Sequence, residues 1–162
     1  MATPRTMLKR PATGFTLIEL LVVMAVLGVL AGLLLPVAEL SVQREREREL
    51  RAALIEIRSA IDAYRAAVRA GEIAAPANES GYPPTLQALV QGSASLSGAG
   101  QRRFLRRVPR DPFAEPGLSA ERSWVLRSYE SSPDAPRPGD NVYDVVSGSG
   151  RVGLNGVPLR EW

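Results

Sequence analysis

The sequence GFTLIELLVVMAVLGVLAGLLLPVA, which occupies residues 14–38, decides the fold of the chain. From Leu20 to Ala38 it has 19 consecutive residues without a polar or charged side chain, and residues 15–19 add only one acid, Glu19. At about 1.5 Å of helical rise per residue, residues 15–38 would extend for roughly 36 Å, more than the bilayer core of about 30 Å. The sequence therefore predicts a membrane-inserted helix over residues 15–38.

The composition excludes most catalytic machinery. The 162 residues include no cysteine and no histidine, and Lys9 is the only lysine. Disulfides, thiolate nucleophiles, metals bound by cysteine or histidine, and Ser-His or Cys-His catalytic pairs are therefore ruled out. Only carboxylate or hydroxyl chemistry remains for an enzyme of this sequence.

The positive charge is concentrated at the N-terminus. The chain has 20 basic and 17 acidic side chains, which gives a formal net charge of +3. Arg5, Lys9 and Arg10 lie within residues 1–14, which contain no acid, so the rest of the chain is neutral. Because basic residues before an apolar run keep that flank in the cytoplasm, residues 1–14 are expected to be an orienting leader rather than a solvated tail. We expect no nucleic-acid partner for a neutral body.

Three fates are open to the apolar run: an uncut membrane anchor, a conventional signal peptide, or a more specific processing signal. A conventional signal peptide has an apolar core of about 7–15 residues, which is shorter than this run, and it rarely carries an acid. Ionisable side chains within a membrane usually have a partner, so Glu19 favours a specific role.

The N-terminal segment resembles the prepilins of the type IV pilin-like family. The shared features are a short basic leader, a glycine before an aromatic residue, an acid fifth after the cleavage site, and an apolar helix. The resemblance implies that a prepilin peptidase cuts after Gly14, removes residues 1–14, and methylates the new N-terminus at Phe15. It also implies that Glu19 acts in assembly and that residues 15–38 form the core of a filament.

Physical chemistry fits these roles. Cleavage would place a cationic amine at Phe15, about one helical turn from Glu19, and in the family this acid meets the amine of a neighbouring subunit. An unpaired charge in an apolar medium is costly, which favours docking in register. The alternative is that Glu19 only stabilises the N-terminus of its own helix. Pro36 lies where such helices often bend, since an interior proline removes a hydrogen bond; alternatively it marks the end of the apolar helix.

A second, polar helix segment is expected over residues 39–71. Residues 44–49 read RERERE, which is typical of a solvated helical neck; ion pairing between subunits is the alternative. Apolar residues then recur at alternating spacings of four and three, at Leu50, Leu54, Ile57, Ile61, Tyr64 and Val68. This stripe predicts an amphipathic helix that packs on a small head, or alternatively a coiled coil. Gly71 is the expected helix stop.

Residues 72–162 are expected to form a small α+β head. Short helices are predicted over residues 84–90 and 101–108, and short strands over residues 123–130, 142–147 and 151–154. The last two strands would form a hairpin around residues 148–150. The predicted fold is therefore pilin-like α+β, with a long N-terminal helix packed on a small antiparallel sheet.

Three blocks in the head narrow the resemblance to the major pseudopilins of type II secretion. They are YPPTLQALV at residues 82–90, FLRRVPRDPF at residues 104–113, and YDVVSG at residues 143–148 followed by Trp162. The blocks occur in the same order as in that branch. The alternative is that Tyr-Pro and Asp-Pro pairs are ordinary turn formers.

Members of this branch often bind calcium in the loop after the closing strand. Calcium takes six to eight oxygen ligands, several of them anionic. Here the loop, residues 148–156, has no acid and one Arg151. The candidate ligands are Asp140, Asp144 and Asn155; the alternative is a loop held by turns and apolar contacts without a metal.

The head also carries five arginines between residues 102 and 110, namely Arg102, Arg103, Arg106, Arg107 and Arg110. A nucleic-acid patch would need aromatic side chains among them for base stacking, and only Phe104 is present. A solvated face or a subunit contact is the preferred interpretation.

The sequence is therefore interpreted as a non-enzymatic pseudopilin of a periplasmic filament that pushes protein substrates outward. The resemblance implies an inner-membrane, single-pass protein with a cytoplasmic N-terminus and a periplasmic head. It further implies self-association, membrane lipid, minor pseudopilins, an assembly ATPase and an inner-membrane platform as partners. The alternatives are a minor type IV pilin for adhesion, motility or DNA uptake, and a membrane-anchored carboxylate enzyme. For the enzyme, the candidate acids are Asp111, Glu115, Asp134, Asp140 and Asp144.

Overall fold

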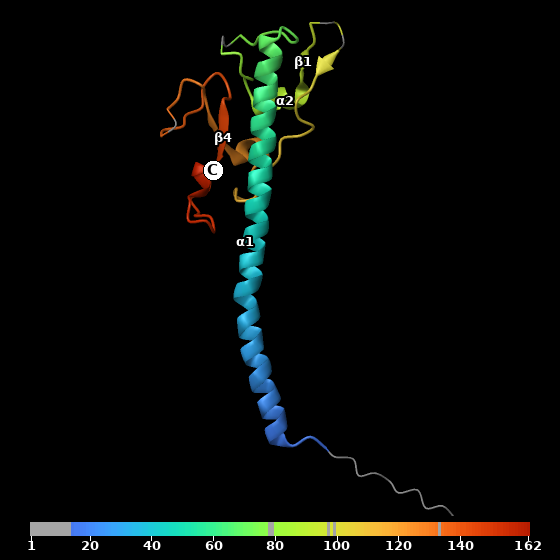
Figure 1. The fold of residues 1–162 in the computed structure, drawn as a ribbon, viewed down its shortest axis with the longest axis vertical. Helices are drawn as coiled ribbons and strands as arrows, with labels where there is room; N and C mark the ends of the chain where they lie inside the picture. The colour runs from blue at the N-terminus through green and yellow to red at the C-terminus, as the bar shows by residue number, and fades with distance from the viewer. Residues whose placement is uncertain (1–13, 78–79, 97, 99, 133) are drawn as a thin grey trace, which may run out of the picture. The chain divides into compact units, whose positions relative to one another are not determined.

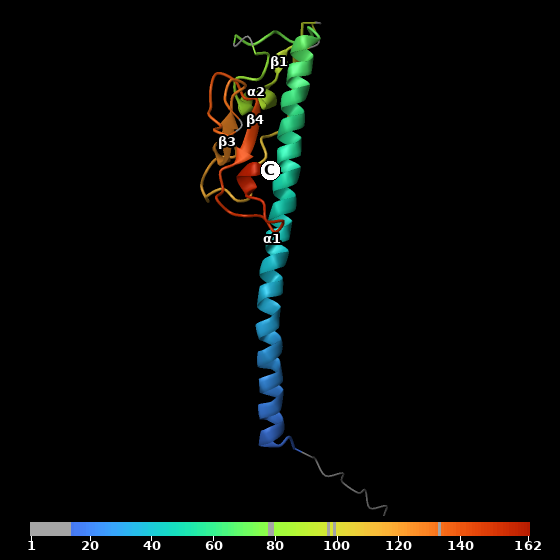
Figure 2. The same cartoon turned by 60° about the vertical axis from the view of Figure 1, so that its left-hand side comes forward.

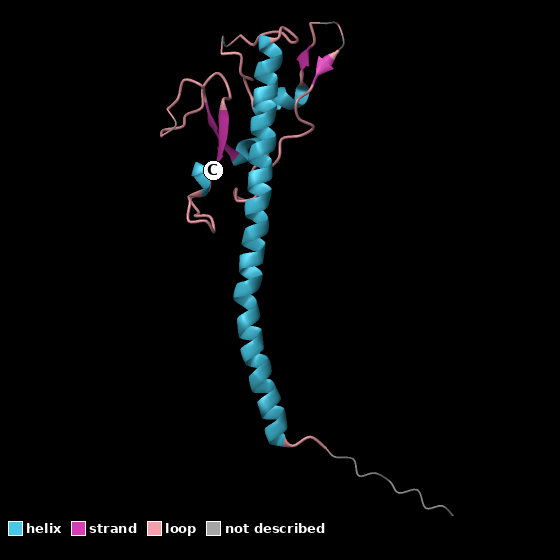
Figure 3. Ribbon diagram, viewed as in Figure 1, coloured by secondary structure: helices cyan, strands magenta, loops and turns pink. Residues whose placement is uncertain are grey.

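The computed structural model describes residues 14–77, 80–96, 98, 100–132 and 134–162, with the side chains of residues 33–37 excepted. Its elements, in chain order, are α1 (Leu17–Arg69), α2 (Leu86–Gln91), β1 (Ser93–Ala94), β2 (Gln101–Arg102), β3 (Trp124–Arg127) and β4 (Asp144–Ser147) (Figures 1 and 3). Single 3-10 turns form at Glu121–Ser123 and Leu159–Glu161. Of the predicted leader, only Gly14 lies within the described residues.

The fold is α+β, as predicted: a long N-terminal helix is combined with small antiparallel sheets. Strands β1 and β2 form one two-stranded sheet, and β3 and β4 form another. In the second sheet Trp124 pairs with Ser147 and Arg127 with Asp144. The chain divides between Ser41 and Val42 into two units, which are described separately below.

The first unit contains the apolar part of α1. The large apolar side chains from Leu17 to Leu30 are exposed around the helix, between 48% and 77% of each side chain's maximum. α1 continues through Pro36, so this proline does not end the helix. A bend at Pro36 stays a prediction, as does the membrane span, since residues 33–37 within it have no described side chains. Over the residues that the structure describes, no helix has both the length and the apolar character of a membrane-crossing segment.

The second unit is built on the amphipathic part of α1. The side chains that α1 contributes to the core are Leu50, Ala53, Leu54, Ile57, Ala60, Ile61, Tyr64 and Ala67. These residues follow the predicted stripe at helical spacing, and they join one cluster with buried residues of α2, β3 and β4. Figure 2 shows β3 and β4 along one side of this part of α1. The head therefore covers the stripe, as predicted.

Local sequence determines where α1 ends and where α2 begins. α1 stops as predicted at Gly71, whose positive φ of 68° turns the chain so that the N–H of Glu72 donates to the Ala67 carbonyl oxygen at 2.9 Å. α2 starts after Thr85, whose Oγ1 accepts a hydrogen bond from the N–H of Ala88 at 3.2 Å. The helix predicted over residues 84–90 is thus confirmed, one to two residues further along the chain.

The helix predicted over residues 101–108 is wrong. Residues 101–102 instead form β2, and the chain then turns so that the N–H groups of Phe104 and Leu105 both donate to the carbonyl oxygen of Leu89, at 2.9 and 3.0 Å. A helix would bond the backbone of this segment to itself, whereas α2 supplies the acceptor here. The same course of the backbone after β2 buries the side chains of Leu105 and Val108.

The strand predicted over residues 151–154 is also wrong. Val152 makes only an isolated bridge with Pro158, and residues 148–150 do not connect two paired strands. β4 pairs with β3 instead, which comes before it in the sequence. The strands predicted over residues 123–130 and 142–147 are confirmed as β3 and β4, at shorter lengths.

Candidate processing and assembly site

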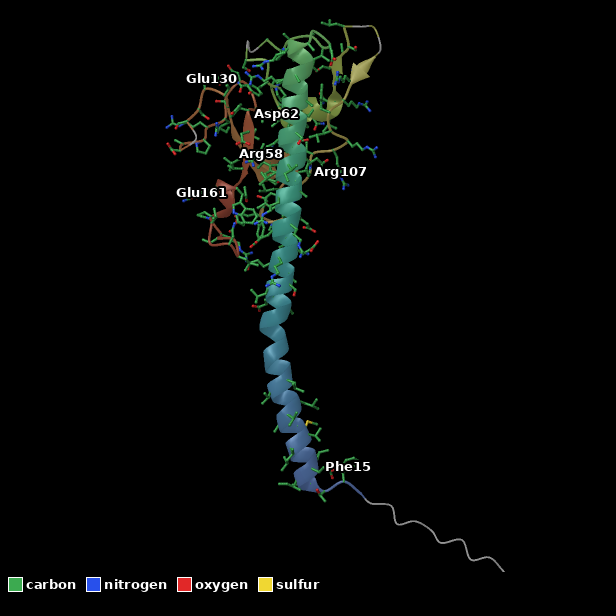
Figure 4. All side chains as sticks on the ribbon, viewed as in Figure 1. Phe15, Arg58, Asp62, Arg107, Glu130 and Glu161 are labelled. Carbon is green, nitrogen blue, oxygen red and sulfur yellow. The ribbon has the colours of Figure 1, made fainter. Side chains whose placement is uncertain are left out.

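The predicted cleavage site lies immediately before α1. Gly14, Phe15 and Thr16 have no regular secondary structure, and α1 begins at Leu17. Phe15 is 81% exposed and is seen beside the start of the helix in Figure 4. Peptidases act on exposed, non-helical segments because the chain must be accessible at the bond that is cut. The Gly14–Phe15 bond meets this requirement.

Nothing in the described structure requires a glycine at position 14. A Cβ atom built on Gly14 would meet no other atom within 4 Å, and the residue has no positive φ. Glycine is needed in a fold where φ is positive or another group approaches closely. Since neither condition holds, the described fold places no demand on Gly14, and its role in recognition by the peptidase stays a prediction.

Thr16 and Glu19 form the beginning of α1. The carbonyl oxygen of Thr16 accepts a hydrogen bond from the N–H of Leu20 at 3.2 Å, and its Oγ1 accepts one from the N–H of Glu19 at 3.3 Å. This Thr-x-x-Glu spacing is the signature of a capping box. Glu19 lies in the first turn, is exposed, and has no ion pair with another described residue. Both of its predicted roles, in assembly and in stabilising its own helix, fit this position and stay predictions.

The charged run before the stripe is mostly exposed in the subunit, which fits both a solvated neck and ion pairing between subunits. Arg44, Glu45, Arg46, Arg48 and Glu49 are exposed, and Arg48 pairs with Glu45 at 3.2 Å along the helix surface. Glu47 is the exception, since only 6% of it is exposed. The alternating charges of residues 44–49 give no sign that Glu47 differs from its neighbours. Its position does, because Glu47 precedes Leu50 by three residues and therefore lies on the same helix face as the apolar stripe.

Three charged side chains of α1 hold the C-terminal segment, and the sequence reasoning missed all three. Glu47 Oε1 accepts a hydrogen bond from the N–H of Leu154 at 2.8 Å. The guanidinium of Arg51 lies 4.3 Å from the ring centroid of Trp162, which is a cation–π contact. Arg58 is the third, and Figure 4 shows it on α1. The available signal was their spacing of four and seven positions, which places them on one helix face.

Arg58 joins α1 to the end of β4 and to the C-terminal turn. Its Nε donates to Asp144 Oδ1 at 2.8 Å, and its Nη2 donates to the carbonyl oxygens of Val145 at 3.1 Å and Trp162 at 2.8 Å. The side chains of Arg58 and Asp144 are 36% and 21% exposed, so the ion pair is partly shielded from water. One guanidinium thus fixes three acceptors from two segments of the head.

The predicted calcium ligands do not fit a calcium ion. Asp144 Oδ1 already accepts hydrogen bonds from Arg58 and from the N–H of Val145, both at 2.8 Å. Asn155 Oδ1 accepts from the N–H of Val157 at 3.1 Å. Asp140 instead lines a shallow hollow together with Glu130. No three acidic side chains lie close together anywhere in the described part of the chain, whereas calcium takes six to eight oxygens.

The first head block, residues 82–90, builds an aromatic cluster. The Tyr82 ring lies under the guanidinium of Arg65, 4.2 Å from its centroid, and its hydroxyl accepts a hydrogen bond from Arg65 Nη1. The rings of Tyr129 and Tyr143 are 5.5 and 5.1 Å from that of Tyr82. Burial raises the pKa of Tyr82, although the nearby Arg65 charge acts in the opposite direction. Tyr82 therefore contributes to the core of the head.

The second block, residues 104–113, contains a buried carboxylate. Asp111 is fully buried; its Oδ2 accepts a hydrogen bond from Ser147 Oγ at 2.6 Å, and its Oδ1 accepts one from the N–H of Phe113 at 2.8 Å. The backbone N–H of Asp111 donates to Ser123 Oγ at 3.0 Å. Asp111 therefore ties the loop to both β4 and the turn before β3. A substrate cannot reach this carboxylate.

The five arginines between residues 102 and 110 differ in their contacts. Arg102 pairs with Glu72, and Arg110 donates to the carbonyl oxygens of Glu115 at 2.5 Å and Leu118 at 3.4 Å. Arg103, Arg106 and Arg107 are exposed. The cluster is thus split between head contacts and a solvated face, in line with the preferred interpretation.

Comparison with known proteins supports the processing site. Residues 9–35 match the model of the prokaryotic N-terminal methylation motif, which includes Gly14, Phe15 and Glu19. No curated protein and no solved structure matched the chain. The motif match and the exposed, capped start of α1 point to the same processing event. The match covers 27 of the 162 residues, so it supports a prepilin-type N-terminus and does not extend to the head.

Proposed function

We propose that the chain is a pseudopilin, a subunit of a type II secretion-like filament in the periplasm that pushes protein substrates outward. The observation that carries the proposal is the Gly14–Phe15 junction, which lies exposed before a capped helix and within the matched methylation motif. The three head blocks, which occur in the same order as in the pseudopilin branch, support that part of the proposal.

The mechanism follows from the charges and the apolar helix. The basic leader holds the N-terminus in the cytoplasm while the inner membrane holds residues 15–38. The prepilin peptidase cuts after Gly14 and methylates Phe15, which leaves a cationic amine. Glu19 of one subunit neutralises the amine of its neighbour, so that apolar helices associate in register. The exposed apolar side chains of residues 17–30 then become buried between subunits.

The implied partners act on the filament from outside this chain. An assembly ATPase and an inner-membrane platform would add subunits, and minor pseudopilins would start the filament. The heads would pack around the helical core in the periplasm. The mature subunit performs mechanical work as part of the filament and catalyses no reaction.

Two of the five acids that could serve a carboxylate enzyme are structural residues of the head, so they are unsuitable for testing that alternative. Alanine at all five candidate acids would remove Asp111 and Asp144, which bond to Ser147 and Arg58, and the head would lose stability for that reason alone. The informative variant carries alanine only at the exposed acids Glu115, Asp134 and Asp140. Unchanged filament function in this variant supports a subunit without catalytic activity.

The processing step is tested by intact-mass analysis of membrane-extracted protein, produced with and without prepilin peptidase. We expect loss of residues 1–14 and one methyl group on Phe15 only when the peptidase is present. Gly14→Val should block cleavage without affecting the head. The matched control is Gly28→Ala, since a Cβ atom at Gly28 also meets no atom within 4 Å. An unprocessed wild-type chain, or one cut after residue 38, contradicts the proposal.

The assembly step needs a second variant. Glu19→Leu keeps the cleavage site and should be cut normally, but its subunits should fail to assemble, as seen by cross-linking of the membrane fraction. Glu39→Leu is the control, because Glu39 is another exposed acid on α1 beyond the apolar run. Assembly of Glu19→Leu at the wild-type level would leave only the helix-stabilising role for this acid.

The branch is tested by deleting the gene and following two outputs. A pseudopilin deletion should retain secreted proteins in the periplasm and leave surface pili intact. Loss of surface pili, adhesion, motility or DNA uptake with normal secretion would instead establish a minor type IV pilin.

A further inference from the structure

The Arg58 contacts have the ligand chemistry of a cation site. The guanidinium is surrounded by one carboxylate oxygen, from Asp144, and two backbone carbonyl oxygens, from Val145 and Trp162. Carboxylates and carbonyls are also the oxygen ligands of calcium in proteins. In this protein the positive charge among these oxygens is the guanidinium of Arg58, which belongs to the chain itself, and not a bound ion.

A divalent ion could use these oxygens only by displacing the guanidinium. Arginine stays protonated and presents donors in a rigid planar fork, so it satisfies several acceptors at once. The loop over residues 148–156 has no acid that would compensate for a second cation, and it contains Arg151. Both the geometry and the local charge are therefore unfavourable for a metal at this place.

We propose that Arg58 is a built-in cation that replaces a divalent metal and makes the C-terminal segment of the head independent of calcium. The guanidinium joins the first residues of β4 to Trp162, which lies in the C-terminal turn. Two further contacts of α1 act on the same segment: Arg51 stacks on the Trp162 ring, and Glu47 binds the N–H of Leu154. The close approach of Gly153 to Trp162 belongs to this arrangement, since a Cβ atom there would lie 2.5 Å from the ring.

The proposal is tested on the full chain in detergent, by thermal unfolding and by limited proteolysis, with calcium chloride or with a chelator. We expect the wild-type midpoint and cleavage rate to be the same in both conditions. Arg58→Gln should be cleaved within residues 148–162 about tenfold faster than wild type, because three hydrogen bonds to one charged group are lost. Arg58→Lys should fall between the two, since an ammonium lacks the planar fork.

Arg48→Gln is the matched control, because Arg48 is on the same helix and its side chain is 73% exposed. It should be cleaved at the wild-type rate. Equal cleavage of Arg58→Gln and wild type would overturn the proposal. So would a calcium-dependent rise in the wild-type midpoint that Asp144→Asn abolishes, since Asp144 would then be a calcium ligand. The comparison of wild type with Asp144→Asn remains decisive even where Arg58→Gln does not fold.

Discussion

Glu47 on α1 accepts a hydrogen bond of 2.8 Å from the backbone N–H of Leu154, 107 residues further along the chain. Gln43 Nε2 donates to the same carboxylate oxygen at 3.0 Å. A carboxylate that is almost completely buried would be costly without such donors. The pair therefore anchors the loop before the C-terminal turn to the helix that carries the core.

Replacing Glu47 should loosen this loop. Glu47→Ala leaves the N–H of Leu154 without its acceptor, so we expect the free energy of unfolding to fall by about 1–3 kcal/mol. Hydrogen exchange at the Leu154 amide should become faster. Glu45→Ala is the control, because the Glu45 side chain is 62% exposed and its pair with Arg48 contributes little. Equal losses in the two variants would contradict the anchoring role.

Two isoleucines of the amphipathic helix, Ile55 and Ile57, should respond very differently to truncation. Ile57 is fully buried in the core, whereas Ile55, two positions earlier, is 66% exposed. Ile57→Ala is expected to lower the free energy of unfolding by about 2–5 kcal/mol, and Ile55→Ala to change it by less than about 0.5 kcal/mol. Chemical denaturation measures both. A comparable loss for Ile55→Ala in the isolated subunit would show that the buried face is not the one described.

Asp111 should be essential for stability and not for chemistry. Asp111→Ala removes a carboxylate that accepts hydrogen bonds from Ser147 and Phe113, so we expect a loss of about 2–4 kcal/mol in the free energy of unfolding. Asp134→Ala, at an exposed acid, should stay within about 0.5 kcal/mol of wild type. Thermal unfolding of the two variants checks this, and a stable Asp111→Ala protein would refute it.

Acid should weaken the contact between Glu130 and Asn141. The backbone N–H of Glu130 and the Asn141 amide hold the pKa of Glu130 below its usual value, and Asn141 Nδ2 lies 3.0 Å from both carboxylate oxygens. A carboxyl with a lowered pKa stabilises the folded state above the pKa of the unfolded chain, about 4.3. This contribution is lost as the pH falls through the lower, folded-state pKa.

The variant Glu130→Gln tests the sign of this effect. Its midpoint of thermal unfolding should lie below that of wild type at neutral pH, and the difference should shrink as the pH falls below about 4. A difference that stays constant from neutral to acidic pH would show that Glu130 does not contribute through its charge.

Local sequence predicted the long helix and its boundaries well. The alternation of three and four residues from Leu50 onward gave the buried face of α1, and Gly71 correctly marked the end of this helix. These features depend on interactions between residues only a few positions apart, so they can be read without knowledge of the fold.

Long-range pairing was predicted less well. The segment over residues 101–108 was predicted as a helix, but its backbone bonds to Leu89 on α2, so a contact with another element outweighed local preference. The segment at 151–154 makes only a bridge from Val152 to Pro158, while β4 pairs with β3. Only the tertiary structure shows that Asp144, one of the calcium candidates, is bound by Arg58, 86 positions away.

The sequence by itself determined the candidate processing site, the apolar helix and the stripe that carries the head, because each is a continuous pattern of charge or hydrophobicity. Only the tertiary structure decided what Glu47, Arg58 and Asp111 do. Each is one charged residue among many in the chain, and composition does not distinguish it from the solvated ones. Folding does so, because it brings to each one a donor or acceptor from a distant segment and removes the water that would otherwise satisfy it.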